Sequence, residues 1–211
     1  MKIRKIIDLC KRSGAIYLFE GKNEQWISDG AAIFPLFNLP RLDESTICTV
    51  YDIDDKKRQK IVFRHEAALP QSYDFNDGVR GEIPAERGPM YLSDGGRGII
   101  PYMTSQGVVF IDAKYLQPFA DIDNGMLNLY ERATDSGQIY FAVKSGFMLV
   151  GIILPVDVIN DQFVDRLKTL LQQCEIALFN KKATSERARQ EDDQLSAFDI
   201  VNGVDSGGDE E

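Results

Sequence analysis

The residues with a spacing suited to catalysis are few. Glu20 and Lys22 have the E-x-K spacing of some nucleases, but only Asp8, on a predicted helix, lies close enough upstream to share a divalent metal. His65 is the only histidine, which excludes a multi-histidine metal site, and its place after an apolar run is typical of a structural or exposed side chain. We therefore predict no catalytic residue, no metal site and no cofactor.

Two further groups allow chemistry but have simpler explanations. Asp52, Asp54 and Asp55 form a carboxylate cluster, yet helix capping accounts for the last two. The segment 95–98, Gly-Gly-Arg-Gly, lacks the spacing of the known phosphate-binding loops, so a turn is the preferred interpretation. An enzyme of a family that these residues do not identify remains an alternative.

Composition indicates a globular chain of 211 residues with reduced thiols. Cys10, Cys48 and Cys174 are odd in number and far apart, which indicates neither a disulfide framework nor a zinc site. No apolar run approaches the length of a membrane span, and the first residues lack a signal-peptide core. We expect a cytoplasmic protein without a membrane partner.

The net charge of −9 hides an uneven distribution. Residues 190–211 hold eight acidic and no basic residues, which leaves only −1 for residues 1–189. Basic residues gather in two predicted helices, at Lys2, Arg4, Lys5, Lys11 and Arg12 and at Lys56, Lys57 and Arg58. A basic helix face can follow the phosphate backbone of double-stranded DNA, although a merely solvated helix face is the alternative.

The elements that would position these side chains indicate an α+β fold. Apolar spacing predicts a helix over 2–13 that ends at Gly14, whereas the alternation in 45–53 predicts a strand. A long helix should begin at Asn160 or Asp161, end near Lys182 and bury one stripe. That stripe comprises Phe163, Leu167, Leu170, Leu171, Cys174 and Leu178.

A short phrase occurs twice and predicts an internal repeat. Residues 27–36 read ISDGAAIFPL and residues 92–102 read LSDGGRGIIPY, each with the Asp-Gly signal of a hairpin. We expect two related β-rich units of mostly antiparallel strands with short helices, although two unrelated hairpins with common turn residues remain the alternative. The expected division is a first unit over 1–70, a connector over 71–89, a second unit with the long helix over 90–182, and a disordered acidic tail over 183–211.

This organisation resembles the modules of DNA sliding clamps over about half the chain. A clamp module is similar in outline, with a basic helix, hairpins with an Asp-Gly turn, and a strand that leads into another helix. The stretch 109–116, VFIDAKYL, looks like the strand-to-helix step of bacterial clamps, and 151–156, GIILPV, is similar to their hydrophobic C-terminal strand. The resemblance implies basic helices that face DNA. The second unit lacks an evident basic helix, and the long helix lies where a clamp chain would have ended.

The acidic tail carries a second resemblance. Gln194, Leu195, Ser196 and Phe198 lie in a segment similar to the bacterial clamp-binding peptide, in which Ala197 replaces the usual Leu. The resemblance implies that Leu and Phe insert into an apolar pocket of a partner while Gln binds at its rim. A solubilising tail is the alternative.

Together these features predict a non-enzymatic accessory protein of DNA replication or repair, either sliding-clamp-like or clamp-binding, with a phage origin as one interpretation. Its expected partners are double-stranded DNA and a bacterial sliding clamp or replication polymerase, and a homo-oligomer is a further candidate. The alternative is an enzyme or a regulatory binding module with no role on DNA.

Overall fold

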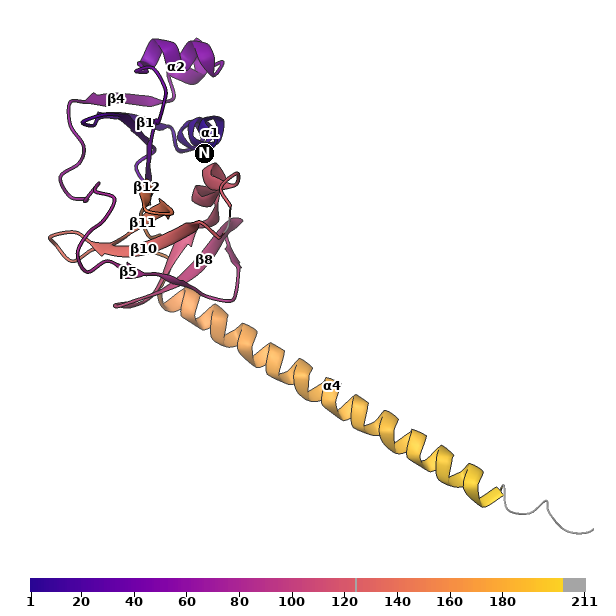
Figure 1. Ribbon diagram of the computed structural model, residues 1–211. Coiled ribbons are helices and arrows are strands. Elements are labelled where there is room, and N and C mark those ends of the chain that lie inside the picture. The colour runs from indigo at the N-terminus through magenta and orange to yellow at the C-terminus, as the bar shows by residue number, and fades with distance from the viewer. Residues whose placement is uncertain (124, 203–211) are drawn as a thin grey trace, which may run out of the picture. The chain divides into compact units, whose positions relative to one another are not determined.

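The computed structural model describes residues 1–123 and 125–202, and side chains within these ranges except those of 94, 187, 188 and 190–202. The chain divides into two compact units, Met1–Asp157 and Val158–Glu211. The fold is a mixture of many strands with short helices and one long C-terminal helix, as the sequence predicted (Figure 1).

The first unit is organised around an eight-stranded sheet in the order β4-β1-β2-β3-β12-β11-β10-β5 (Figure 1). Its strands are β1 Ala15–Glu20, β2 Gln25–Ser28, β3 Ala32–Pro35, β4 Val62–Glu66, β5 Ile83–Pro84, β10 Leu127–Ala133, β11 Ile139–Ser145 and β12 Met148–Ile153. All neighbours are antiparallel except β1 and β4. Because β3 pairs with β12 through Ile33 and Ile152, the two predicted β-rich regions share this sheet.

A smaller sheet forms around the long strand β8, Arg97–Thr104. On it lie β6 Glu86–Arg87, β7 Leu92–Asp94 and β9 Gly107–Asp112, all antiparallel to β8. The turn from β7 to β8 uses Gly95 and Gly96, both with positive φ, which confirms the predicted turn.

The two Ser-Asp-Gly phrases occupy different places in the fold. Gly30 lies between β2 and β3 in the large sheet, whereas Gly95 lies between β7 and β8 in the small one. The structure therefore does not confirm the equivalence of Gly30 and Gly95. Each phrase forms a hairpin turn, because Asp-Gly suits a tight reversal that needs a positive φ.

Local signals account for most short helices. Helix α1, Ile3–Ser13, ends as predicted at Gly14, which has a φ of 76° and donates its N–H to the Cys10 carbonyl. Helix α3, Asp55–Arg58, is capped by Asp54, and the 3₁₀ helix η1, Ala113–Phe119, is capped by Asp112. The strand predicted over 45–53 is wrong, because Glu44–Val50 forms helix α2 behind the N-cap Asp43.

The core of the first unit lies between the sheet and the α1–η1 pair. Ile6, Ile7 and Cys10 of α1 belong to one buried cluster with strand residues such as Ile27 and Phe141. Phe119 of η1 joins the same cluster and packs on Phe34 with ring centroids 5.7 Å apart. Burial of these apolar side chains is the main term that stabilises the unit.

The second unit consists of helix α4, Asp161–Asn202. Asn160 caps it as predicted, since its Oδ1 accepts the N–H of Phe163 at 2.9 Å. The helix continues past the predicted end at Lys182 to Asn202, and residues 203–211 of the predicted tail lie outside the described range. Residues 183–189 contain no Gly or Pro, so no local stop signal ends the helix there. Among the described residues, no helix has the length and apolarity of a membrane span.

The predicted buried stripe of α4 is mostly exposed. Phe163 is buried, but Leu167, Leu170, Leu171 and Leu178 are 37%, 52%, 59% and 54% exposed, and Cys174 is exposed. The burial expected from their spacing is therefore wrong for every member except Phe163. Amphipathic spacing predicts a helix face that prefers burial but does not say which surface covers it.

Candidate functional site

Helix α1 separates an apolar face from a cationic one. Its buried side chains are Ile6, Ile7, Leu9 and Cys10. The exposed cations of the helix and its N-cap residue are Lys2, Arg4, Lys5 and Arg12. Within the described residues, no carboxylate lies within ion-pairing distance of Arg4 or Lys5. The apolar face anchors the helix in the core, and the opposite face presents positive charge to solvent.

The fifth predicted cation of α1, Lys11, has a different role. It is half-buried and its ammonium donates to the Tyr51 carbonyl at 2.6 Å, beside the end of α2. The Val62 N–H also donates to the Gly14 carbonyl at 2.9 Å. These bonds hold the C-terminal end of α1 against the segment 51–62, so Lys11 positions the helix.

The second predicted basic group is largely neutralised within the protein. Lys57 pairs with Asp54 at 3.2 Å, and Arg58 pairs with Glu44 and lies 4.8 Å from the ring centroid of Phe63. The hydrogen bond to Glu44 raises the pKa of Arg58. Lys56 is exposed, and no carboxylate of the described residues ion-pairs with it. Lys11 and Arg58 are thus half-buried and engaged within the protein, whereas the prediction that this group binds DNA stays untested.

A buried hydrogen bond joins two of the phrases identified in the sequence. The hydroxyl of Tyr115 donates to Asp29 Oδ2 at 2.9 Å, while Oδ1 accepts the N–H groups of Ala31 and Ala32. Burial raises the pKa of Tyr115, and the negative charge of Asp29 raises it further. The contact fixes η1 on the β2–β3 turn. Separately, the Lys2 N–H donates to the carbonyl of Pro118 in η1 at 2.8 Å. The start of α1 thereby lies beside η1.

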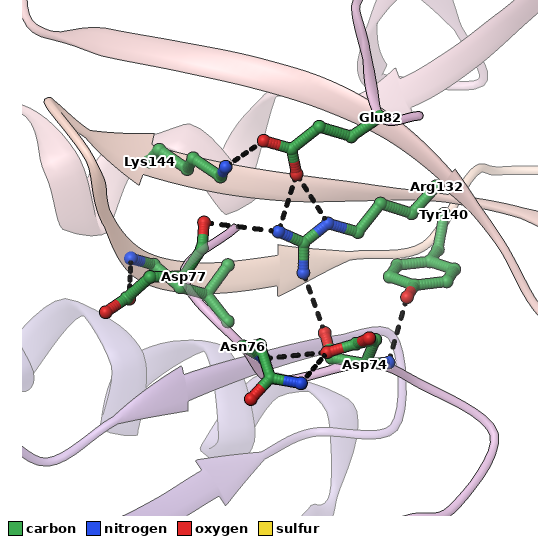
Figure 2. Close-up of polar contacts among 8 residues, drawn as sticks. Asp74, Asn76, Asp77, Glu82, Arg132, Tyr140 and Lys144 are labelled. Carbon is green, nitrogen blue, oxygen red and sulfur yellow. Dashed lines mark hydrogen bonds and ion pairs between the residues drawn. The ribbon is translucent and has the colours of Figure 1, made fainter. Parts of the chain in front are cut away.

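A buried ion cluster that the sequence did not predict holds the connector on the large sheet (Figure 2). The side chains of Arg132 and Lys144 are only 2% and 6% exposed, and both pair with Glu82. Burial opposes ionisation of Glu82, but hydrogen bonds from Lys144 and Arg132 outweigh it and hold the pKa below its ordinary value. The only sequence signal was a cation placed within each of two apolar strand runs.

The same cluster borders a cavity of about 570 Å³ between the connector and strands β10 and β11. Arg132 donates to both Glu82 and the Asp74 carbonyl, and Tyr140 accepts the Asp74 N–H at 2.9 Å (Figure 2). Asp77 in turn accepts the N–H of Leu149 at 2.8 Å. Because Arg132 and Lys144 both bind Glu82, we assign these three side chains a structural role in holding the connector on the sheet.

The catalytic candidates are likewise engaged. Glu20 accepts hydrogen bonds from His65 at 2.7 Å and from Gln25 at 3.0 Å, and it pairs with Arg41. The bond from His65 lowers the pKa of Glu20 most. In the described part of the chain, no three potential metal ligands gather in one place. The nuclease interpretation of Glu20 and Lys22 therefore has no metal-binding geometry to support it there.

The predicted partner-binding residues Gln194, Leu195, Ser196 and Phe198 have side chains outside the described set, although their backbone belongs to α4. Comparisons of the chain with protein family models, curated proteins and solved structures found no match.

Proposed function

We propose that this protein is a non-enzymatic, cytoplasmic accessory factor of DNA replication or repair that binds the backbone of double-stranded DNA through α1. The observation that carries the proposal is the exposed cationic face of α1, made by Lys2, Arg4, Lys5 and Arg12. A rigid helix with several exposed cations can contact successive phosphates without reading base sequence. The low net charge of residues 1–189 favours such a local positive surface.

The arrangement of helices and strands supports a clamp-like body. Helix α1 is followed by β1, β2 and β3, and η1 is followed by β10, β11 and β12, each as an antiparallel meander. The two meanders join at β3 and β12, and the two helices touch. We infer that these segments are the two related units, in place of the boundaries that the Ser-Asp-Gly phrases suggested.

The segment of η1, β10, β11 and β12 contributes less positive charge than the segment of α1, β1, β2 and β3. Lys114, in η1, pairs with Asp112 at 3.2 Å. The proposed DNA contact therefore depends mainly on α1, which distinguishes this protein from a clamp with several basic helices. Docking of residues 194–198 on a bacterial clamp remains a separate proposal that rests on the sequence motif. An extended peptide of that kind would have to leave the helical backbone of α4.

Charge reversal on α1 tests the proposal. We expect the triple variant Arg4→Glu, Lys5→Glu and Arg12→Glu to lose affinity for duplex DNA in fluorescence anisotropy at low salt. The matched control reverses three exposed cations elsewhere, Lys22, Arg64 and Arg80, so that both variants undergo the same change in net charge. Circular dichroism checks that α1 still folds.

The control separates a local contact from a general electrostatic effect. If the binding face is α1, only the α1 variant loses affinity by about tenfold or more, since each phosphate contact contributes to binding. Equal loss in both variants would mean that net charge alone attracts DNA. Absence of binding by the unaltered protein at low salt would contradict the proposal.

A further inference from the structure

Helix α4 exposes an apolar stripe with coiled-coil spacing. Val164, Leu167, Leu171, Cys174 and Leu178 follow one another at alternating steps of three and four residues. Leu167, Leu171 and Leu178 are 37%, 59% and 54% exposed. A seam of this spacing packs against a facing helix of the same kind, and long isolated helices gain little stability without such packing.

Charged residues flank one edge of the stripe at intervals of seven. Asp161, Lys168, Glu175 and Lys182 alternate in sign and are all exposed. Positions seven apart lie on the same side of a coiled-coil seam. The opposite edge carries the uncharged residues Phe163, Leu170 and Ala177. The charges therefore occupy one edge only, which distinguishes between the possible orientations of a partner helix.

We propose that α4 pairs in antiparallel orientation with α4 of a second copy of this chain. When Leu171 lies opposite Cys174 of the other copy, Leu167 lies opposite Leu178. In this register Lys168 faces Glu175 of the second copy, and Asp161 faces its Lys182. The charged edge is thus complementary to itself only when one helix is reversed.

A parallel pair lacks this complementarity. In a parallel coiled coil, one edge of the first helix faces the opposite edge of the second. The charged edge would then face Phe163, Leu170 and Ala177, and no ion pair would form between the helices. In the parallel pair, Lys181 of one copy would also lie at the seam beside Lys181 of the other copy, so two like charges would meet. In the antiparallel register its aliphatic stem instead covers Val164, while the ammonium reaches solvent.

Antiparallel pairing closes with two-fold symmetry, so the proposed assembly is a dimer. The inference does not depend on DNA binding, because it uses neither α1 nor any of its cations.

Substitution in the stripe tests whether α4 makes the interface. We expect sedimentation equilibrium of the full chain to give a dimer, and Leu171→Ser to raise the dissociation constant by about 100-fold because each copy loses a seam side chain. The control is Ile176→Ser. Ile176 is as exposed as Leu171, at 62%, but lies off the stripe. Its loss should leave the dimer unchanged.

Charge exchange tests the orientation. Lys168→Glu or Glu175→Lys alone should weaken the dimer by about tenfold, because two symmetry-related attractions become repulsions. The double variant should restore it. Lys168 also lies 3.5 Å from Asp165 in its own helix, and that local contact stays disrupted in the double variant, so restoration reports only the contact between copies.

The results that overturn the proposal are distinct. A monomer at all concentrations, or a dimer indifferent to Leu171→Ser, rules out the α4 interface. A trimer, or a dimer that the double charge exchange fails to restore, rules out the antiparallel pairing.

Discussion

At the scale of single residues, buried polar contacts determine how the elements meet. Asp29 and Tyr115 belong to phrases that the sequence identified separately, as a turn and as a strand-to-helix step. Their hydrogen bond joins these two places in the fold. The sequence could identify both residue types, but not the contact, because a hairpin signal carries no information about its distant partner.

Removal of the Tyr115 hydroxyl should destabilise the protein. We expect Tyr115→Phe to lower the free energy of unfolding by about 1–3 kcal/mol, because the buried Asp29 carboxylate loses a donor. Urea denaturation followed by tryptophan fluorescence measures the change. Tyr91→Phe, at an exposed position, is the control and should have no effect. An equally small effect of Tyr115→Phe would mean that Ala31 and Ala32 suffice to satisfy Asp29.

The buried ion cluster predicts a specific pH dependence. The pKa of Glu82 is lowered in the folded protein, so its contribution to stability is present above the ordinary value of 4.5 and is lost as pH falls through the lowered value. Glu82→Gln should cost about 3 kcal/mol at neutral pH, since Arg132 and Lys144 lose their buried carboxylate. It should also lose less stability than the unaltered protein on acidification.

Urea denaturation at neutral pH and at a pH below 4.5 tests this pair of effects. Glu86→Gln, an exposed glutamate in β6, is the control. A constant difference between Glu82→Gln and the unaltered protein at both pH values would contradict the assignment of the acid sensitivity to Glu82.

At the scale of elements, capping signals predicted better than periodicity. Gly14 ends α1 and Asn160 begins α4 as their residue types indicated. The segment of α2 is rich in β-branched residues, and its alternation predicted a strand. Asp43 instead accepts the Thr46 N–H at 2.7 Å and begins a helix. A local cap and burial of Ile47 outweighed the intrinsic propensity.

This account makes α2 dependent on its cap. We expect Asp43→Ala to lower the melting temperature by about 2 °C, as is typical for loss of one N-cap in a protein of this size. Asp43→Asn keeps a capping oxygen and should retain most of the stability. Differential scanning calorimetry measures both variants. If Asp43→Asn lowered the melting temperature as much as Asp43→Ala, the negative charge of Asp43 would be the stabilising feature, and the capping hydrogen bond would not be.

At the scale of the whole molecule, the sequence predicted the α+β class but not how its parts join. The pairing of β3 with β12 places distant segments in one sheet, and no local pattern specifies such a pairing. The sequence alone predicted the uneven distribution of charge along the chain and the basic face of α1. Which cations remain exposed depended on tertiary contacts, such as those that engage Lys11 and Arg58.

The salt dependence of DNA binding tests the central claim most directly. If Lys2, Arg4, Lys5 and Arg12 contact phosphates, the logarithm of the binding constant should fall with the logarithm of salt concentration with a slope of about −3 to −4. The triple α1 variant, which keeps only Lys2, should bring that slope to about −1. A slope that the variant leaves unchanged, or no measurable affinity of the unaltered protein at low salt, would contradict DNA binding through α1.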